Sequence, residues 1–214
     1  MLWQEKNVRE NLRNRQGKRV FYLPKGDQLT SAARDFLTAQ RIEILPVPQK
    51  MPKPEHQTHL NGDVLVPKTH PRIRFRGKLD TLESELILCQ LALPLLAQPL
   101  GELLERTRQI LRCEVLETPL DDASLLGLTE AELRSHSHRP QEFYGIPHFM
   151  PQSSDGKTIG KLNHLRTVVR ETELAAAGAF LDAEGNPTRT DILKELNRMS
   201  SAVYLLMIQE KRKL

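Results

Sequence analysis

Residues 158–180 read TIGKLNHLRTVVRETELAAAGAF, and this stretch decides the fold. Its apolar side chains recur at helical spacing and form one stripe: Ile159, Leu162, Leu165, Val169, Ala176 and Phe180. Such a stripe indicates an amphipathic helix that packs against other helices. Residues 190–211 carry a second stripe, at alternating intervals of four and three residues: Ile192, Leu196, Met199, Val203 and Leu206. Those intervals are typical of a seam in a helical bundle.

Three further segments are predicted to be helical. Residues 78–97 are apolar almost all round, which favours a place at the centre of a bundle. Residues 100–116 carry leucines and an isoleucine on one side. Residues 128–136 begin with Thr129 and Glu132 at the spacing of a capping box. We therefore predict an all-α fold, a five-helix up-and-down bundle.

The start of the chain predicts a small β-α-β appendage. RVFYL (19–23) and RIEILPV (41–47) are typical of strands, and Thr30 or Ser31 can cap a helix between them. Three prolines in PQKMPKPEHQ indicate an extended linker. The predicted organisation is an appendage at 1–46, a linker at 47–57 and the bundle at 58–214.

The composition is that of an ordinary soluble protein with a small excess of positive charge. The formal net charge is +4 over 214 residues, and no block of five like charges occurs. An acidic ligand such as a nucleotide fits this balance. A basic helical nucleic-acid binder is an alternative, but an aromatic content of 5 % is low for a protein that stacks bases. We expect no nucleic-acid partner.

The sequence also predicts neither a membrane segment nor a metal site. The longest apolar run, LILCQLALPLLA, is too short to span a bilayer, and the N-terminus is too polar for a signal peptide. Cys89 and Cys113 lie in apolar helical patterns, as buried free thiols do, and no CxxC motif occurs. The protein is therefore expected in the cytoplasm, or inside a cytoplasmic microcompartment.

One group of polar residues stands out on the helix that decides the fold. Arg166, Arg170 and Glu173 are four and three residues apart, so they share one helical face, and Asn197 follows on the next helix. One interpretation is a solvated face held by ion pairs worth ~0.3–0.5 kcal/mol each. The other is a phosphate clamp, because guanidinium groups bind phosphate through paired hydrogen bonds.

Two other segments permit a structural and a functional interpretation. In VPKTHPRIRFRGKLD (66–80), Lys68 and three arginines are expected to precede a helix, with Asp80 near its N-terminus, where the helix dipole favours an acid. Alternatively, Lys68 binds phosphate. In HFMPQSSDGKTIGKL (148–162), the polar residues either cap a helix or present N–H groups to an anion. Phe149 and Met150 either line an apolar pocket or plug the end of the bundle.

These segments resemble the ATP:cob(I)alamin adenosyltransferases of the PduO type, in the same order along the chain. The matching stretches are KTHPRIRFRGKLDTL, FMPQSSDGKTIGKLNHLRTVVRETEL and LNRMSSAVYL. YLPKGDQLTSAARDFL and the THL at 58–60 make the resemblance closer to the EutT branch, which serves ethanolamine utilisation. The resemblance covers nearly the whole chain. It implies a five-helix bundle that assembles as a homotrimer, with sites between subunits.

The resemblance also implies roles for single residues. Lys68, Arg170, Glu173 and Asn197 match ATP contacts of the family, and Thr58 falls in its N-terminal nucleotide loop. The family's catalytic machinery includes the position of Arg170, whose charge, with Lys68 and Mg²⁺, would neutralise the departing triphosphate.

Three more positions follow from the same resemblance. Asp80 and Arg166 match a pair that bridges neighbouring subunits, and Phe149 lies where the family has an aromatic side chain near the lower corrin face. The implied reaction is transfer of the 5′-deoxyadenosyl group of ATP to cob(I)alamin, which makes adenosylcobalamin for a partner such as ethanolamine ammonia-lyase. Cobalt is the nucleophile, so no side chain attacks.

The chain departs from the family pattern in three places. The glycine-rich loop of the PduO type is absent, and two basic positions are Glu171 and Leu174 here. The cysteines that bind a divalent metal in many EutT-type enzymes are absent too, with only His56 and His59 in that region. These departures leave an alternative function, a non-catalytic carrier or chaperone for a corrinoid or nucleotide.

Overall fold

A computed structural model describes residues 1–15, 17–47, 54–62 and 64–214. The chain divides into two compact units, Met1–Lys68 and Thr69–Leu214. The second unit is helical, and strands occur only in the first among the described residues that form named elements. The predicted fold class, a helical bundle with a small N-terminal β-containing appendage, is confirmed.

The first unit contains the predicted β-α-β elements and several that the sequence did not indicate. Its elements up to residue 46 are β1 (Leu2–Trp3), α1 (Glu5–Glu10), β2 (Arg13–Arg15), β3 (Lys18–Leu23), β4 (Gln28–Leu29), α2 (Ser31–Ala39) and β5 (Glu43–Pro46). β3 pairs in parallel with β5 and antiparallel with β2, and β1 pairs in parallel with β4. The Thr30 hydroxyl caps α2 by accepting from the Ala33 N–H at 3.2 Å. Phe21 and Leu37 are buried in the core between sheet and helices.

A β-hairpin ends the first unit. It consists of β6 (Gln57–Asn61) and β7 (Val64–Pro67), which pair antiparallel, with Thr58 opposite Val66. The Lys68 N–H donates to the His56 carbonyl oxygen at 2.9 Å and closes the base of the hairpin. Residues 48–53 of the predicted linker lie outside the described residues, and the predicted domain boundaries stay predictions.

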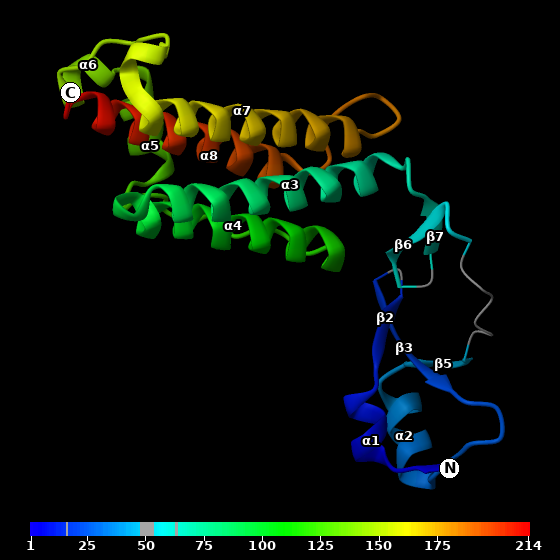
Figure 1. Cartoon of the computed structure of the whole chain (residues 1–214). Coiled ribbons are helices and arrows are strands. Elements are labelled where there is room, and N and C mark those ends of the chain that lie inside the picture. Colours follow the sequence, from blue (N-terminus) through cyan, green and yellow to red (C-terminus); the bar gives the residue numbers. More distant parts are fainter. Residues whose placement is uncertain (16, 48–53, 63) are drawn as a thin grey trace. The chain divides into compact units, whose positions relative to one another are not determined.

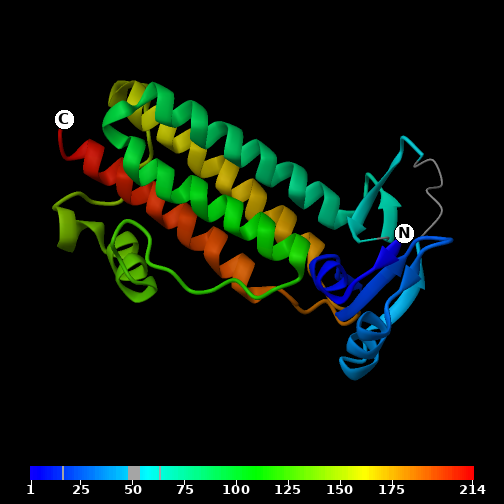
Figure 2. The ribbon, with the colours of Figure 1, turned by 90° about the horizontal axis from the view of Figure 1, so that it is seen from below.

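The second unit is built on four long helices, which run side by side in Figures 1 and 2. Its elements are α3 (Pro71–Ala92), the 3₁₀ turn η1 (Pro94–Leu96), α4 (Ala97–Leu116), α5 (Glu130–His138), α6 (Pro140–Tyr144), the 3₁₀ turn η2 (Ser153–Asp155), α7 (Gly156–Ala179) and α8 (Thr190–Lys211). α7 packs against α8 and α3, α3 packs against α4, and α5 packs against α8. Thr129 and Glu132 form the predicted capping box at the start of α5.

The apolar stripes that predicted the bundle are its core. Every residue of the α7 and α8 stripes is at most 5 % exposed. Burying one such side chain contributes ~1.5–3 kcal/mol, so the two stripes hold α7 and α8 at fixed register. This register brings polar side chains of the two helices, such as Glu173 and Asn197, next to each other.

The prediction for α3 was wrong in two respects. The helix begins at Pro71 rather than near residue 78, because proline suits the first helical position and the His70 Nδ1 accepts from the Arg72 N–H at 3.2 Å. Asp80 therefore lies well inside α3, where the dipole argument does not apply. Nor does α3 lie at the centre of the bundle with every face buried, because Leu88 is 54 % and Leu91 77 % exposed.

The arginines near the start of α3 fasten it to α4 instead of preceding the helix. The Glu114 carboxylate is fully buried and accepts from the Arg72 Nε at 2.6 Å and the Arg76 Nε at 2.5 Å. Arg72 also donates to Glu117 at 2.9 Å. A buried carboxylate needs such partners to offset its desolvation.

In the described part of the chain, no single helix is long and apolar enough to cross a membrane. Among the residues that the structure describes, only α3 taken together with the helical segment Pro94–Leu116 has the length and composition, and the two are bent by 119°.

Candidate functional site

Two of the predicted site residues meet on the seam between α7 and α8. The Asn197 side-chain amide donates to the Glu173 carboxylate at 3.1 Å. Arg170 precedes Glu173 by three residues on α7, so both side chains share one face of the helix. The pair joins the two helices and leaves one Glu173 oxygen and the Asn197 carbonyl oxygen for a ligand.

Arg170 is exposed, and no hydrogen bond or ion pair holds its guanidinium within the described residues. Nor does any described ion pair link Arg166, Arg170 and Glu173 to one another. The interpretation of these residues as a solvated face stabilised by its own ion pairs therefore finds no support. Arg166 and Arg170, one helical turn apart, instead repel each other.

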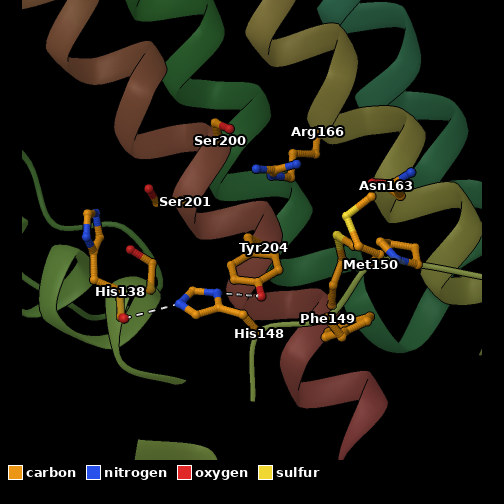
Figure 3. A pocket seen from close by; sticks show the side chains of 12 residues that line it. His138, His148, Phe149, Met150, Asn163, Arg166, Ser200, Ser201 and Tyr204 are labelled. Atoms are coloured by element: carbon orange, nitrogen blue, oxygen red, sulfur yellow. Dashed lines mark hydrogen bonds between the residues drawn. The ribbon is translucent and has the colours of Figure 1, made fainter. Parts of the chain in front are cut away.

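Arg166 extends from α7 into a pocket (Figure 3). Its Nε is buried and has no hydrogen-bond partner among the described residues. Burial, and then the neighbouring charge of Arg170, lower the pKa of the Arg166 guanidinium from its usual value. The guanidinium carbon lies 5.5 Å from the centre of the Tyr204 ring. A half-buried cation without a carboxylate is costly, and an anionic partner would relieve that cost.

The pocket has a volume of about 610 Å³ and one aromatic wall. It is lined by side chains from the end of α5, the segment 148–151, α7 and α8: Ser137, His138, His148, Phe149, Met150, Pro151, Asn163, Arg166, Ser200, Ser201, Tyr204 and Met207. Phe149 and Met150 thus line a pocket rather than only plugging the end of the bundle. Met150 lines the pocket and is 85 % exposed.

Tyr204 is the centre of this wall. Its ring stacks with the Phe149 ring at 6.2 Å between centres and with the His148 ring at 5.8 Å. The Tyr204 hydroxyl lies 3.0 Å from the His148 Nδ1, and the His148 Nε2 lies 3.2 Å from the His138 carbonyl oxygen. A carbonyl only accepts, so Nε2 carries the proton and Nδ1 accepts from the tyrosine. Both ring nitrogens of His148 are therefore occupied.

The remaining predicted residues lie elsewhere. Asp80 is exposed on α3, and within the described residues no side chain pairs with its carboxylate. Thr58, half-buried on β6, and Lys68, exposed after β7, belong to the other compact unit. The structure thus brings Glu173 and Asn197 together, places Arg166 and Phe149 in one pocket, and leaves Asp80 free for a ligand or a partner.

The sequence did not single out His148, Asn163, Ser200 or Tyr204. Tyr204 is half-buried and directly follows Val203 of the α8 stripe. The available signal was its hydroxyl beside an apolar stripe, because a tyrosine whose ring is partly buried usually finds a hydrogen-bond partner.

The described residues contain no group of three or more His, Cys, Asp and Glu side chains that could hold a metal ion. Cys89 is buried and Cys113 half-buried, and both are free thiols. Burial raises the pKa of the Cys89 thiol, which keeps it protonated.

The family model of the cobalamin adenosyltransferases matches residues 51–210. This chain belongs to that family. Corrinoid adenosyltransferase EutT of Salmonella typhimurium is 40% identical over 157 residues, which cover 73% of this chain and 59% of that protein. EutT of Escherichia coli K12 is 38% identical with the same coverage. The chain therefore spans about three-fifths of the length of the curated relatives it matches.

A solved structure shows the same fold. It is a phenylalanine-to-alanine variant of a PduO-type ATP:corrinoid adenosyltransferase from Lactobacillus reuteri, complexed with cobalamin and ATP. The TM-score is 0.55 at 18% sequence identity, and the match covers 77% of this chain and 94% of that chain. The helical bundle described above is thus the fold of a cobalamin adenosyltransferase.

This member of the family uses Glu171, one of its departures from the family pattern, for packing. The Glu171 carboxylate accepts from the Lys78 ammonium at 2.8 Å and links α7 to α3. That ion pair lowers the pKa of Glu171. Leu174, the other departure, is 72 % exposed. Neither side chain supplies the positive charge that the PduO pattern has there.

Proposed function

We propose that this protein is an ATP:corrinoid adenosyltransferase that transfers the 5′-deoxyadenosyl group of ATP to cob(I)alamin. Family membership supports the proposal, and one observation in the structure carries it. A pocket with the aromatic wall of Phe149 and Tyr204 contains a half-buried arginine, Arg166, which has no ion-pair partner among the described residues and lies on the same helix as the Arg170–Glu173 face. An apolar surface for a corrin and a cationic face for a triphosphate are thus both formed on α7, α8 and the segment 148–151.

The proposed nucleotide contacts of the bundle are Arg170, Glu173 and Asn197. Thr58 and Lys68 belong to the other compact unit, and their part in nucleotide binding is proposed from the family resemblance alone. Arg170 offers a guanidinium that no described carboxylate neutralises, so its full charge is available to a phosphate oxygen. Asn197 holds Glu173 in place through the 3.1 Å hydrogen bond. As triphosphate leaves, the preorganised cations stabilise its growing charge.

Mg²⁺ fits this arrangement as an ion carried by the nucleotide. It is commonly held by one or two carboxylates together with phosphates and water, rather than by a cage of protein ligands. Glu173 is the carboxylate of the seam that would face it. When bound, Mg²⁺ would neutralise part of the triphosphate charge.

The proposed corrinoid contact is the wall formed by Phe149, Met150 and Tyr204. Cobalt of the reduced corrinoid is the nucleophile, so the protein needs to position it within about 3–3.5 Å of the ribose 5′ carbon rather than to attack. An apolar wall leaves the lower face of the cobalt without a ligand. The His148 imidazole beside this wall is not available to the cobalt, because both of its nitrogens are engaged.

We further propose that the protein works as a homotrimer in the cytoplasm or in a microcompartment, and supplies ethanolamine ammonia-lyase. Asp80 and Arg166 support the assembly, because each lacks a charged partner within the described residues. An ion pair between the Asp80 of one subunit and the Arg166 of the next would satisfy both.

A non-catalytic carrier of the same fold is the second candidate. The observation in its favour is the loss of positive charge at Glu171 and Leu174, where Glu171 is engaged by Lys78. A carrier would bind ATP and corrinoid without joining them.

An anaerobic assay separates the two functions. Purified protein is mixed with ATP, chemically reduced cobalamin and Mg²⁺ in the dark, and formation of the cobalt–carbon bond is followed by absorbance. An adenosyltransferase forms adenosylcobalamin and triphosphate in equal amounts over many turnovers. Binding of both ligands without that product would overturn the proposed enzyme and support the carrier.

A further inference from the structure

Lys211, in the last turn of α8, contacts both ends of the segment that carries the aromatic wall. Its ammonium donates to the Asp155 Oδ1 at 2.5 Å and lies 5.7 Å from the centre of the Phe149 ring. The ammonium is within the distance at which a cation is attracted to the face of a ring. Asp155 is 7 % exposed, so this ion pair is shielded from solvent on one side.

Asp155 anchors the segment to the start of α7. Its second oxygen accepts from the Gln152 N–H at 2.8 Å, so the carboxylate also fixes the turn that leads into the helix. The Lys211 ion pair, followed by the Gln152 N–H, lowers the pKa of Asp155, which keeps it ionised. The following residue, Gly156, has a φ of +82°, so the chain enters α7 in a backbone conformation that favours glycine.

Phe149 is therefore held on two sides. Tyr204 stacks against it, with the ring centres 6.2 Å apart, and Lys211 of the same helix lies over it. Phe149 itself lies in a segment without helix or strand, where backbone hydrogen bonding alone does not fix a ring. The position of this wall of the pocket thus depends on side chains of α8.

We propose that Lys211 is a positioning residue that sets Phe149 at the corrinoid pocket through its joint contact with Asp155 and the ring. The inference rests on the proposed adenosyltransferase function. It assigns the role to the lysine's contacts with the protein, and no contact between Lys211 and either substrate is needed. Phe149 would shift when the lysine is removed, and the corrinoid rather than ATP would sense the change.

The test uses the full chain and three variants: Lys211→Met, Lys211→Arg and Lys213→Met. Lys213 is the matched control, because it lies two residues further on and forms an exposed ion pair with Glu210 at 2.5 Å. We expect Lys211→Met to lower kcat/KM for cob(I)alamin about tenfold, because a cation–π contact and the partner of a buried carboxylate are lost together. KM for ATP should stay within twofold. Lys211→Arg should restore most of the loss, and Lys213→Met should resemble the unmodified protein.

A second measurement separates positioning from general stability. In a Phe149→Ala background, Lys211→Met should cause no more than a twofold further loss, since the lysine acts through a ring that is absent. Equal tenfold losses in both backgrounds, or an unchanged corrinoid KM and kcat in Lys211→Met, would overturn the positioning role. If Lys211→Met does not fold, Asp155→Asn takes its place and should give the same selective loss.

Failure of the proposed function can be told apart from failure of the positioning role of Lys211. An unmodified chain that makes no adenosylcobalamin overturns the enzyme itself, and the inference with it. An active unmodified chain with insensitive Lys211 variants overturns only the inference.

Discussion

Replacement of Glu114 by glutamine tests whether the buried ion cluster between α3 and α4 stabilises the bundle. The substitution keeps the size of the side chain and removes its charge. Arg72 and Arg76, whose side chains are 17 % and 16 % exposed, then lose the carboxylate that both share. Breaking a buried pair from one side costs ~3–5 kcal/mol.

The structure indicates the lower end of that range. Arg72 keeps two other acceptors, the Glu117 carboxylate at 2.9 Å and the Glu114 backbone carbonyl at 3.1 Å. We therefore predict that Glu114→Gln lowers the free energy of unfolding by about 3 kcal/mol. For a protein of this size, ~2–4 °C of Tm accompanies each kcal/mol, so Tm should fall by roughly 6–12 °C.

Urea unfolding followed by helical circular dichroism measures the effect. Glu83→Gln is the matched control, because Glu83 also joins α3 to α4 through Arg108, at 2.7 Å, but that arginine is 50 % exposed. An exposed pair contributes ~0–1 kcal/mol. Equal shifts of the urea midpoint in the two variants would refute the reasoning that burial makes the Glu114 cluster the stronger link.

Three further predictions concern catalysis, pH and assembly. Arg170→Ala should lower turnover by about 10²–10³, the scale of losing one preorganised charge contact; full activity in the anaerobic assay would contradict the clamp. The pKa of Asp191 is about 2: burial would raise it, but hydrogen bonds from Arg189 and backbone N–H groups lower it below the usual 3.8. Because the folded pKa is depressed, this carboxylate stabilises the fold above pH ~4, and that contribution of about 2 kcal/mol is lost as pH falls through about 2. Unfolding free energies of the unmodified protein and Asp191→Asn should therefore differ at pH 5 and converge near pH 2; a constant gap would contradict this. Asp80→Arg should dissociate the proposed homotrimer, because the new arginine would repel Arg166 in the proposed contact between subunits; an unchanged mass in sedimentation velocity would contradict this.

The sequence allowed the bundle to be predicted because the apolar residues of its two main stripes recur at helical intervals and not at the two-residue interval of a strand. The residues of the α7 and α8 stripes match a helix and no strand, and all of them are buried. The start of α3 was missed for a different reason. Three arginines at alternate positions suggested an exposed basic segment that precedes the helix. In the structure, Arg72 and Arg76 lie in the helix and bind Glu114, which is 42 and 38 residues away in sequence. Only tertiary structure identifies such a partner, although the His70–Pro71 start signal was present.

The candidate site, too, was predicted only in part from the sequence. Glu173 and Asn197 were found from local spacing and the family motif, and their side chains meet. Phe149 was placed at a pocket by the motif alone. Tyr204 and His148 were missed, because their hydrogen bond joins residues 56 positions apart and neither has a motif of its own. Helix periodicity predicts which face is buried, but it does not predict which polar atoms meet across the end of a bundle.

The helix α8 fixes the distance between the proposed nucleotide contact and the proposed corrinoid contact. Asn197 and Tyr204 are seven residues apart, close to two full turns, so they project from the same side about 10 Å apart along the axis. A single residue inserted between them would swing one by roughly 100° relative to the other. The distance between the proposed nucleotide contact Asn197 and the proposed corrinoid contact Tyr204 is thus fixed by the backbone of α8, and a side-chain substitution that preserves the helix does not lengthen it.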